Sequence, residues 1–349
     1  MVVAYMATWI FASSMDMPRE GSLDIWHRWD AVHYLAISEH GYRGPGTVGY
    51  VTAFWPLLPI LVRGLSELGL SPIVAGLSIS AVASLVAARY LYDLAETEVG
   101  EGAGRKAVLY LLLFPTAVFL IAPYSEPLFL AGAVPAFYYA RRRRWLAVAP
   151  AAFVAVAARP AGVFLLIGLF VEFLDQRDFS RKSLLRVGAA LFIAVLPLMA
   201  YLTYLWVIRG DPFAFLSDER VGWLREFKGP ISAFLTTIRF VGEPSLDPNF
   251  RIAYAGELAA AAVGIAFTSL ALSRRLWGYA AFMGSTLATL LVSTHYFSVP
   301  RALLSLFPIV LLVASFTKER GRAHDLVLVV FAPLATLGVI TFTRWLWFF

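Results

Sequence analysis

The chain has 349 residues, of which 60% are hydrophobic and only 15% are charged. Soluble domains usually carry about 25% charged residues, so this composition excludes a soluble multidomain protein. The net charge of +6 does not indicate nucleic-acid binding, because the arginines cluster at the ends of apolar runs, as in cytoplasmic loops. The sequence contains no cysteine, which excludes disulfides and thiolate metal sites.

The apolar runs are long enough to cross a bilayer, which needs roughly 20 residues per helix. They predict an all-α polytopic membrane protein that forms a single domain over 1–349. The first run lacks a basic leader and a small-residue cleavage site, so we expect a retained span. No internal repeat supports an inverted-repeat transporter. About eleven transmembrane helices are predicted, at 1–15, 70–92, 105–122, 126–140, 145–158, 160–174, 187–208, 252–272, 276–293, 301–316 and 325–343.

The distribution of basic residues predicts the orientation. With the N-terminus inside, the inner loops hold 15 Lys and Arg and the outer regions hold 10. The run Arg141–Arg144 favours this orientation most strongly, and we give it no catalytic role. The two long loops, about 16–69 and 209–251, then lie outside the cytoplasm and carry short interfacial helices. The segment Phe54–Ile60 is expected in the interface, where tryptophan suits the headgroup level.

The first long loop contains an unusual cluster of polar and aromatic residues. Residues 26–40 include two Trp, one Arg, Asp30 and three of the five His of the chain. A carboxylate in such company at a membrane boundary is costly, and ionisable residues there usually have a function. The stretch Asp30–His40 predicts a short helix ended by Gly41. The alternative is that Asp30 only caps this helix, which does not use both carboxylate oxygens.

The functional interpretation makes Asp30 a general base. His27, Asp30 and His33 are spaced three apart and would share a helix face if the helix began early. A carboxylate there can take a proton from a sugar hydroxyl as that hydroxyl attacks an activated donor. Burial against neighbouring tryptophans would raise the pKa of this carboxyl, whereas Arg28 would lower it, and the sequence leaves the balance open.

A divalent metal is an alternative for the same residues. His27, Asp30, His33 and His40 offer nitrogen and oxygen ligands. Histidines near a membrane surface more often form hydrogen bonds or contact substrate. We therefore expect no required cofactor.

Further candidates stand at the outer ends of predicted spans. Tyr124, Ser125 and Glu126 follow a proline at a tight external turn. Glu126 either caps the next helix or orients a sugar hydroxyl.

Two arginines lie on the same side of the membrane as Asp30. Arg159 stands between two apolar runs, and His295 and Arg301 flank an external turn. The guanidinium group is a fixed fork of donors that suits phosphate oxygens. Snorkelling of each arginine to the interface is the alternative. Both arginines are predicted at the outer face of the membrane, as are Asp30 and Glu126, and this favours a site that all four share.

These residues resemble the signatures of PIG-V-type mannosyltransferases, a family of the C-type glycosyltransferase (GT-C) superfamily. The resemblance covers nearly the whole chain in order, and the Trp-Asp and Tyr-Ser-Glu blocks are specific in combination. One departure is His33, where some relatives have Glu. The blocks are Arg28–Tyr34, Glu39–Tyr42, Ala53–Pro56, Phe114–Ala117, Ala122–Phe129, Ala158–Gly162, Gly210–Pro212 and the region of Arg301.

The resemblance implies a donor, a base and a sugar site. Members of the superfamily use lipid-phosphate-linked sugars outside the cytoplasm, which implies polyprenyl-phosphate mannose as donor here. In the superfamily an acidic residue of the first external loop acts as the base, and the resemblance implies that this residue is Asp30 here. Eukaryotic members add a mannose during GPI-anchor assembly, but a short cysteine-free chain looks prokaryotic. We expect the substrate to contact His27, Arg28, Trp29, His33, Tyr34, His40, Tyr42, Tyr124, Ser125 and Glu126.

The sequence thus predicts an inverting mannosyltransferase of a prokaryotic cytoplasmic membrane, multi-pass and with its site facing outside. Arg159, Arg301 and His295 are predicted to neutralise the departing lipid phosphate. The expected partners are the lipid-linked donor, a glycolipid, glycan or protein acceptor, and the bilayer, but no nucleic acid. The alternatives are a transporter or lipid flippase gated by the first-loop cluster, and a purely structural membrane subunit.

Overall fold

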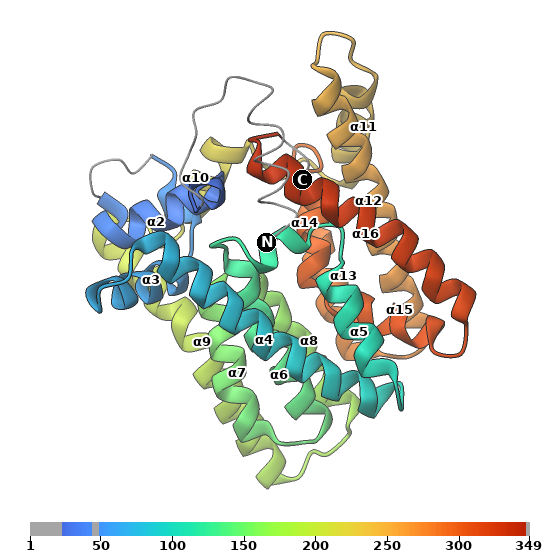
Figure 1. The fold of residues 1–349 in the computed structure, drawn as a ribbon. Coiled ribbons are helices and arrows are strands. Elements are labelled where there is room, and N and C mark those ends of the chain that lie inside the picture. Colours follow the sequence, from blue (N-terminus) through green and yellow to red (C-terminus); the bar gives the residue numbers. More distant parts are fainter. Residues whose placement is uncertain (1–22, 44–48, 347–349) are drawn as a thin grey trace.

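The computed structural model describes residues 23–43 and 49–346, and every regular element within these ranges is helical (Figure 1). This confirms the predicted all-α class. The first predicted span, 1–15, lies outside the described residues. The long helices form a bundle, and one hydrophobic core extends through it from Ile25 to Phe342.

The first part of the chain forms a series of short helices, η1 to α3, which we call the cap, and then the helices of the bundle. In order these are η1 (Asp24–Trp26), α2 (Asp30–His40), η2 (Gly41–Arg43), η3 (Val51–Ala53), α3 (Leu57–Glu67), α4 (Pro72–Glu98), α5 (Ala103–Leu112), η4 (Ala117–Leu120), α6 (Ser125–Arg141), α7 (Trp145–Ala158) and α8 (Ala161–Asp175).

The rest of the chain returns to the cap in a short helix between two long ones, and again near its C-terminal end, where Phe342 packs against Trp26. The elements are α9 (Arg181–Arg209), α10 (Ala214–Trp223), α11 (Pro230–Gly242), α12 (Pro248–Ser273), α13 (Trp277–Leu291), α14 (Val299–Ser305), α15 (Pro308–Thr317) and α16 (Gly321–Thr343).

Within the described ranges, four helices are long and apolar enough to cross a membrane, namely α4, α9, α12 and α16. The bent pair α14 and α15 would make a fifth. The predicted number of eleven is therefore not confirmed, although shorter helices occupy the spans predicted around α6, α7, α8 and α13. Large apolar side chains on the long helices face outwards, for example Leu85 (70% exposed), Trp206 (64%) and Val329 (69%). Such a surface suits a lipid environment, and the protein is a multi-pass membrane protein.

Two predicted spans are interrupted by proline. The span 105–122 is divided into α5 and η4, and 301–316 into α14 and α15, which meet at 75°. Proline has no amide hydrogen, so Pro115 and Pro308 cannot donate to the carbonyl groups of Leu111 and Leu304 four residues earlier. These breaks turn the chain at the points where it approaches the cap.

Small residues allow the central helices to pack closely. A methyl group on Gly132 of α6 would lie 2.5 Å from the carbonyl oxygen of Ala151 in α7. One on Gly168 of α8 would lie 2.8 Å from the carbonyl oxygen of Gly278 in α13. Close approach of backbones increases van der Waals contact, which drives helix association in membranes.

The basic loops predicted to be inside meet at one end of the bundle, the lower end in Figure 1. Lys106 donates from Nζ to the carbonyl oxygen of Thr317 at 2.7 Å, and Arg143 donates to that of Gln176 at 3.3 Å. The short helices α2, α10 and α14 lie at the opposite end, together with the start of α6 and the end of α7. The polar residues of the predicted site are at this opposite end.

Candidate active site

Asp30 is the first residue of α2, and its carboxylate faces a cation instead of capping the helix. The preceding Trp29 has a φ of 53°, which turns the chain sharply into α2. The backbone N–H of Asp30 donates to the hydroxyl of Tyr124 at 3.0 Å. Its Oδ2 accepts from Nη1 of Arg301 at 2.5 Å, and the Asp30 side chain is 19% exposed. Because the helix begins at Asp30, His27 lies before it and does not share a helix face with it.

Glu126 lies beneath this pair in the first turn of α6 and is 0% exposed. Its Oε1 accepts from Nε of Arg301 at 2.5 Å and lies 2.6 Å from Nη1 of Arg159. Arg159 also donates to the hydroxyl of Ser305 at 3.1 Å. The four charged residues Asp30, Arg301, Glu126 and Arg159 therefore form one ionic chain in which two negative and two positive charges balance.

Local structure explains how each arginine reaches the chain. The α7 helix ends at Ala158, and Arg159 is extended, with φ −168° and ψ 161°, before Pro160, the N-cap residue of α8. The start of α14, which carries Arg301, is held by Glu257 of α12. This buried carboxylate accepts from the backbone N–H of Ser298 at 2.7 Å and of Val299 at 2.8 Å. Both arginines are thus fixed by breaks between helices.

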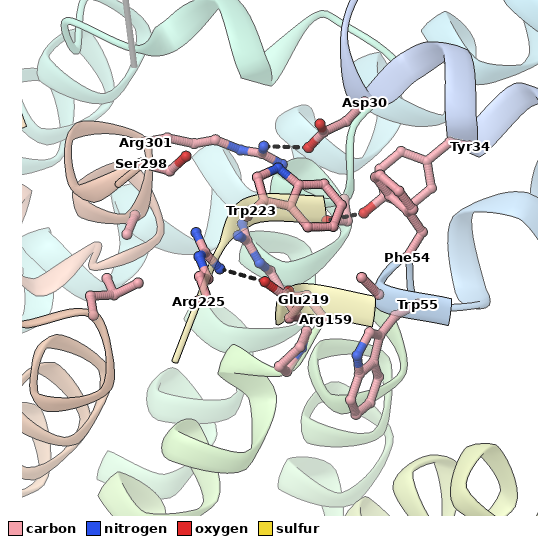
Figure 2. A pocket seen from close by; sticks show the side chains of 15 residues that line it. Asp30, Tyr34, Phe54, Trp55, Arg159, Glu219, Trp223, Arg225, Ser298 and Arg301 are labelled. Atoms are coloured by element: carbon pink, nitrogen blue, oxygen red, sulfur yellow. Dashed lines mark hydrogen bonds and ion pairs between the residues drawn. The ribbon is translucent and has the colours of Figure 1, made fainter. Parts of the chain in front are cut away.

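The ionic chain borders two cavities. Cavity 1, of about 110 Å³, is lined by Asp30, Tyr34, Ala53, Phe54, Trp55, Ser125, Arg159, Pro160, Glu219, Trp223, Arg225, Leu290, Ser298, Arg301 and Ala302 (Figure 2). Cavity 2, of about 240 Å³, is lined by Trp29, Asp30, His33, Tyr50, Phe119, Tyr124, Gly222, Trp223, Phe297, Ser298, Arg301, Phe342 and Leu346. Asp30 and Arg301 line both, so a group in either cavity meets the same carboxylate and cation.

The structure brings several of the other predicted residues to these cavities. Tyr34 donates from its hydroxyl to that of Ser125 at 3.0 Å on the wall of cavity 1. Trp29, His33 and Tyr124 line cavity 2. Burial lowers the pKa of His33, although nearby Asp30 raises it, so its imidazole is mainly neutral at pH 7.

Ten of the residues that line cavity 1 are not among the predicted site residues, and four of these carry a charge or an indole ring, namely Trp55, Glu219, Trp223 and Arg225. The last three come from the loop 209–251, where residues of both charges are mixed and no motif around these three residues indicated a site. Glu219 and Arg225 pair at 3.0 Å, as Figure 2 shows.

The α10 helix, which positions these three residues, is fixed to the first loop. Asp218 is buried and accepts from the backbone N–H of Thr52 at 3.0 Å and from its hydroxyl at 2.5 Å. Arg209 lies 3.3 Å from the other carboxylate oxygen of Asp218. These long-range contacts place α10 over the site, and local sequence carries no signal for them.

Trp55 differs from its predicted interfacial position. It is 1% exposed and packs against the ring of Tyr201 at 5.3 Å, while α3 beyond it is amphipathic, with Leu58 buried and Ile60 62% exposed. The indole Nε1 of Trp55 is buried and has no hydrogen-bond partner within residues 23–43 and 49–346. Trp55 is one of the residues that line cavity 1, and an unpartnered indole N–H is a donor that a ligand oxygen can use.

Other predicted residues lie outside both cavities. His27 is exposed, and His40 lies 3.9 Å from Glu39 at the exposed end of α2. Arg28 is buried against the ring of Trp345 of the C-terminal segment, 5.2 Å from its centre.

Tyr42 and His295 are also not part of the walls of cavities 1 and 2. The hydroxyl of Tyr42 donates to the carbonyl oxygen of Phe54 at 2.6 Å, and its ring lines a separate apolar cavity of about 480 Å³ between α2, α3, α7 and α9. His295 is packed among the rings of Phe240, Tyr254 and Phe297. Among the described residues no group of three or more His, Asp or Glu is arranged to hold a metal ion, so the four candidate ligands of the metal alternative do not converge there.

Comparisons with known proteins agree with the fold and the motifs. The family model Mannosyltransferase (PIG-V) matches residues 6–207. The GPI alpha-1,6-mannosyltransferase 2 of Cricetulus griseus is 36% identical over 130 residues, which cover 33% of this chain and 25% of that protein. The chain thus matches about a quarter of the length of this curated relative.

A solved structure, of ArnT from Cupriavidus metallidurans bound to undecaprenyl phosphate, matches with a TM-score of 0.59 at 15% identity. The match covers 97% of this chain and 62% of ArnT, and it confirms the predicted GT-C-like fold. One relative is eukaryotic and the other bacterial, so the prokaryotic origin stays a prediction. Since the family model covers more than half of the sequence, the chain belongs to the PIG-V mannosyltransferase family.

Proposed function

We propose that the protein transfers mannose from polyprenyl-phosphate mannose to an acceptor hydroxyl, with inversion at the anomeric carbon. The observation that carries this proposal is the ionic chain on the wall of two adjoining cavities, with one carboxylate, Asp30, directly beside a phosphate-binding cation, Arg301. The family and the likeness to ArnT, whose solved structure holds undecaprenyl phosphate, support a lipid-linked donor.

The charges in the ionic chain match the requirements of the reaction. The donor phosphate is a diester with one negative charge, and it gains a second charge when its bond to the sugar breaks. Asp30 loses its negative charge when it takes the proton of the acceptor hydroxyl. The proton transfer therefore leaves Arg301 and Arg159 with one uncompensated positive charge, which stabilises the leaving phosphate as its charge develops.

The wall of cavity 1 supplies the groups that a phosphate-linked sugar needs. Arg159, Arg225 and Arg301 face the cavity, and guanidinium forks bind phosphate oxygens in two-point contacts. Trp55 offers its orphaned indole N–H to a sugar hydroxyl. Glu126 is a positioning residue in this scheme, because it holds both Arg159 and Arg301 from beneath and is not part of the cavity wall.

The orientation that we propose places this end outside the cytoplasm. The basic loops gather at the opposite end of the bundle, and an excess of Lys and Arg marks the cytoplasmic side. A donor whose lipid chain lies in the outer leaflet would then present its phosphate at the level of the ionic chain.

The test is an assay of the whole protein in liposomes with radiolabelled polyprenyl-phosphate mannose. We expect transfer of label to added mannoside acceptors, insensitivity to EDTA, and a product of opposite anomeric configuration to the donor, as read by NMR. Release of labelled lipid to the other leaflet without any transfer would favour the flippase alternative and contradict the proposal. Retention of configuration would contradict the single displacement.

A further inference from the structure

Glu257 is a buried carboxylate in α12, a helix that is long and apolar enough to cross a membrane. Its side chain lies in the first half of the helix, and the residue is 1% exposed. An ionisable group in such a helix is costly and usually has a function. Glu257 is not among the described residues that line cavities 1 and 2. Its role therefore lies in the residues that it contacts.

The carboxylate of Glu257 binds two successive backbone N–H groups. Its Oε1 accepts from Ser298 at 2.7 Å and its Oε2 from Val299 at 2.8 Å, so both oxygens are used. Successive N–H groups at a turn form a concavity that binds anions. The anion here is a side chain 41 residues away along the chain. This contact joins α12 to the start of α14.

The turn that Glu257 holds has an unfavourable backbone conformation. Ser298 has a φ of 61° and a ψ of 25°, the left-handed region that residues with a Cβ atom rarely adopt. An ordinary N-cap residue is extended, and its side chain accepts a hydrogen bond from the first turn of the helix. Ser298 is not extended, and within the described residues its side chain makes no capping hydrogen bond. The start of α14 is thus held from another helix.

The same turn determines where Arg301 stands. The α14 helix has only seven residues and meets α15 at 75°, so no continuous helix fixes its direction. Its first intrahelical bond runs from the N–H of Ala302 to the carbonyl oxygen of Ser298 at 3.0 Å. The guanidinium of Arg301 has to reach Asp30 and Glu126 at once, at 2.5 Å each (Figure 2). A shift of the turn would move this guanidinium away from one or both carboxylates.

We propose that Glu257 is a positioning residue of the transfer reaction, which holds the left-handed turn at Ser298 and thereby keeps Arg301 in place. This inference rests on the proposed function and adds to it a residue that acts at a distance from the substrates. A carboxylate suits the role because both of its oxygens accept, whereas the side chain of Gln offers one acceptor and one donor. Glu257→Gln therefore leaves one buried N–H group without an acceptor.

The first test is a double-mutant cycle with Arg301. It uses the whole protein in liposomes, with polyprenyl-phosphate mannose and methyl α-mannoside at saturation. We expect Glu257→Gln to lower kcat about 30-fold in the wild-type background and less than about threefold in the Arg301→Ala background. Glu257→Asp keeps the charge and shortens its reach by one methylene, so it should show a smaller loss with the same dependence on Arg301. This milder variant decides the question if Glu257→Gln does not fold.

The second test removes the strain in the turn. Glycine adopts a φ of about 61° without a steric cost, so a turn with Ser298→Gly needs less support from Glu257. We expect Glu257→Gln to lower kcat no more than about fivefold in the Ser298→Gly background. Both proteins in this comparison lack the serine hydroxyl, so a direct role of that hydroxyl does not change the ratio. The control is Glu172→Gln, which removes a buried carboxylate of α8 and should lower the melting temperature but not kcat.

The outcomes distinguish this inference from the function on which it rests. Equal losses of kcat in the wild-type and Arg301→Ala backgrounds, or an unchanged kcat in folded Glu257→Gln, would overturn the positioning role while the function stands. An equal loss with and without Ser298→Gly would overturn the role of the left-handed turn. If the wild type neither transfers mannose nor hydrolyses the donor, the proposed function is contradicted. Amide hydrogen exchange at Ser298 and Val299 would then still show whether Glu257 holds the turn, since we expect faster exchange in Glu257→Gln.

Discussion

Both ends of the helix bundle contain a partly buried cluster of arginine and carboxylate groups, and only one of these clusters borders cavities 1 and 2. At the end opposite the site, Arg141 lies 3.1 Å from Glu98, 3.4 Å from Glu172 and 4.6 Å from the centre of the Tyr279 ring. We call these four residues the opposite cluster. None of them lines the three cavities that border α2.

The difference teaches that burial of charge does not by itself mark a functional site. The opposite cluster joins α4, α6, α8 and α13, and its two carboxylates share a guanidinium among these helices. In the ionic chain the carboxylates and cations balance one another, and two of the four residues, Asp30 and Arg301, reach both cavities. Buried ion pairs are weak evidence for added stability, but breaking one is strongly destabilising. Substitutions at the two ends should therefore affect different properties.

The largest effect is expected from removing the arginine at each centre. Arg301→Ala should lower kcat/KM at least about 10³-fold, because it removes a cation from both the bound and the departing phosphate. Arg141→Ala should lower the melting temperature in detergent but leave the transfer rate per folded molecule within about threefold. Mannose transfer and thermal unfolding, measured on the same preparations, check both. Loss of turnover in folded Arg141→Ala would show that the two ends are not functionally distinct.

The next effect concerns the carboxylate that holds two arginines. Glu126→Gln leaves Arg159 and Arg301 close together without their shared counter-charge, so we expect a loss of stability of about 3 kcal/mol and a fall in turnover of about 10²-fold from misplaced cations. Glu172→Gln is the matched change at the other end and should cost stability alone. Denaturant unfolding and transfer assays give the two numbers. A Glu126→Gln protein with normal turnover would remove the positioning role.

A smaller effect is expected from the orphaned indole. Trp55→Phe keeps an aromatic ring against Tyr201 and removes only the Nε1–H donor. If this N–H binds a hydroxyl of the donor sugar, the donor KM should rise about fivefold, in line with roughly 1 kcal/mol for one hydrogen bond, while the acceptor KM stays constant. An unchanged donor KM would mean that no ligand oxygen uses this donor.

The smallest effect is a pH dependence of stability. Burial, and secondly the charge of Arg225, lower the pKa of His295 below its usual 6.5. The folded protein then binds fewer protons than the unfolded chain, so this residue costs no stability above about pH 6.5 and reduces stability as the pH falls below it. His295→Phe suits the surrounding rings and should make the free energy of unfolding depend less on pH as the pH falls below about 6.5. An unchanged slope in that variant would contradict the assignment to His295.

Much of the site was predictable because its residues stand where apolar runs end. Asp30, Glu126, Arg159 and Arg301 each follow or precede such a boundary, and the orientation rule placed all four on one side. Their meeting in one ionic chain is then a consequence of bundling the helices.

Other features could not be predicted from local sequence. Glu219, Trp223 and Arg225 reach cavity 1 only because Asp218 fixes α10 to Thr52, a contact between residues 166 apart. His295 and Arg28 carry the right chemistry but are enclosed by rings of other segments. The number of spans was also not predictable, since apolar runs of 14 to 17 residues form helices here that are shorter than a bilayer crossing requires.

The central claim is that the carboxylate of Asp30 takes the proton of the acceptor hydroxyl, and its most direct test is the turnover number of Asp30→Asn at saturating donor and acceptor. Asn has the same shape and can still accept a hydrogen bond from Arg301, so folding should be retained. Glu39→Gln, at the exposed end of the same helix, is the control. We predict that kcat falls about 10²–10⁴-fold in Asp30→Asn and is unchanged in Glu39→Gln. A kcat for folded Asp30→Asn within threefold of the wild type would contradict the account.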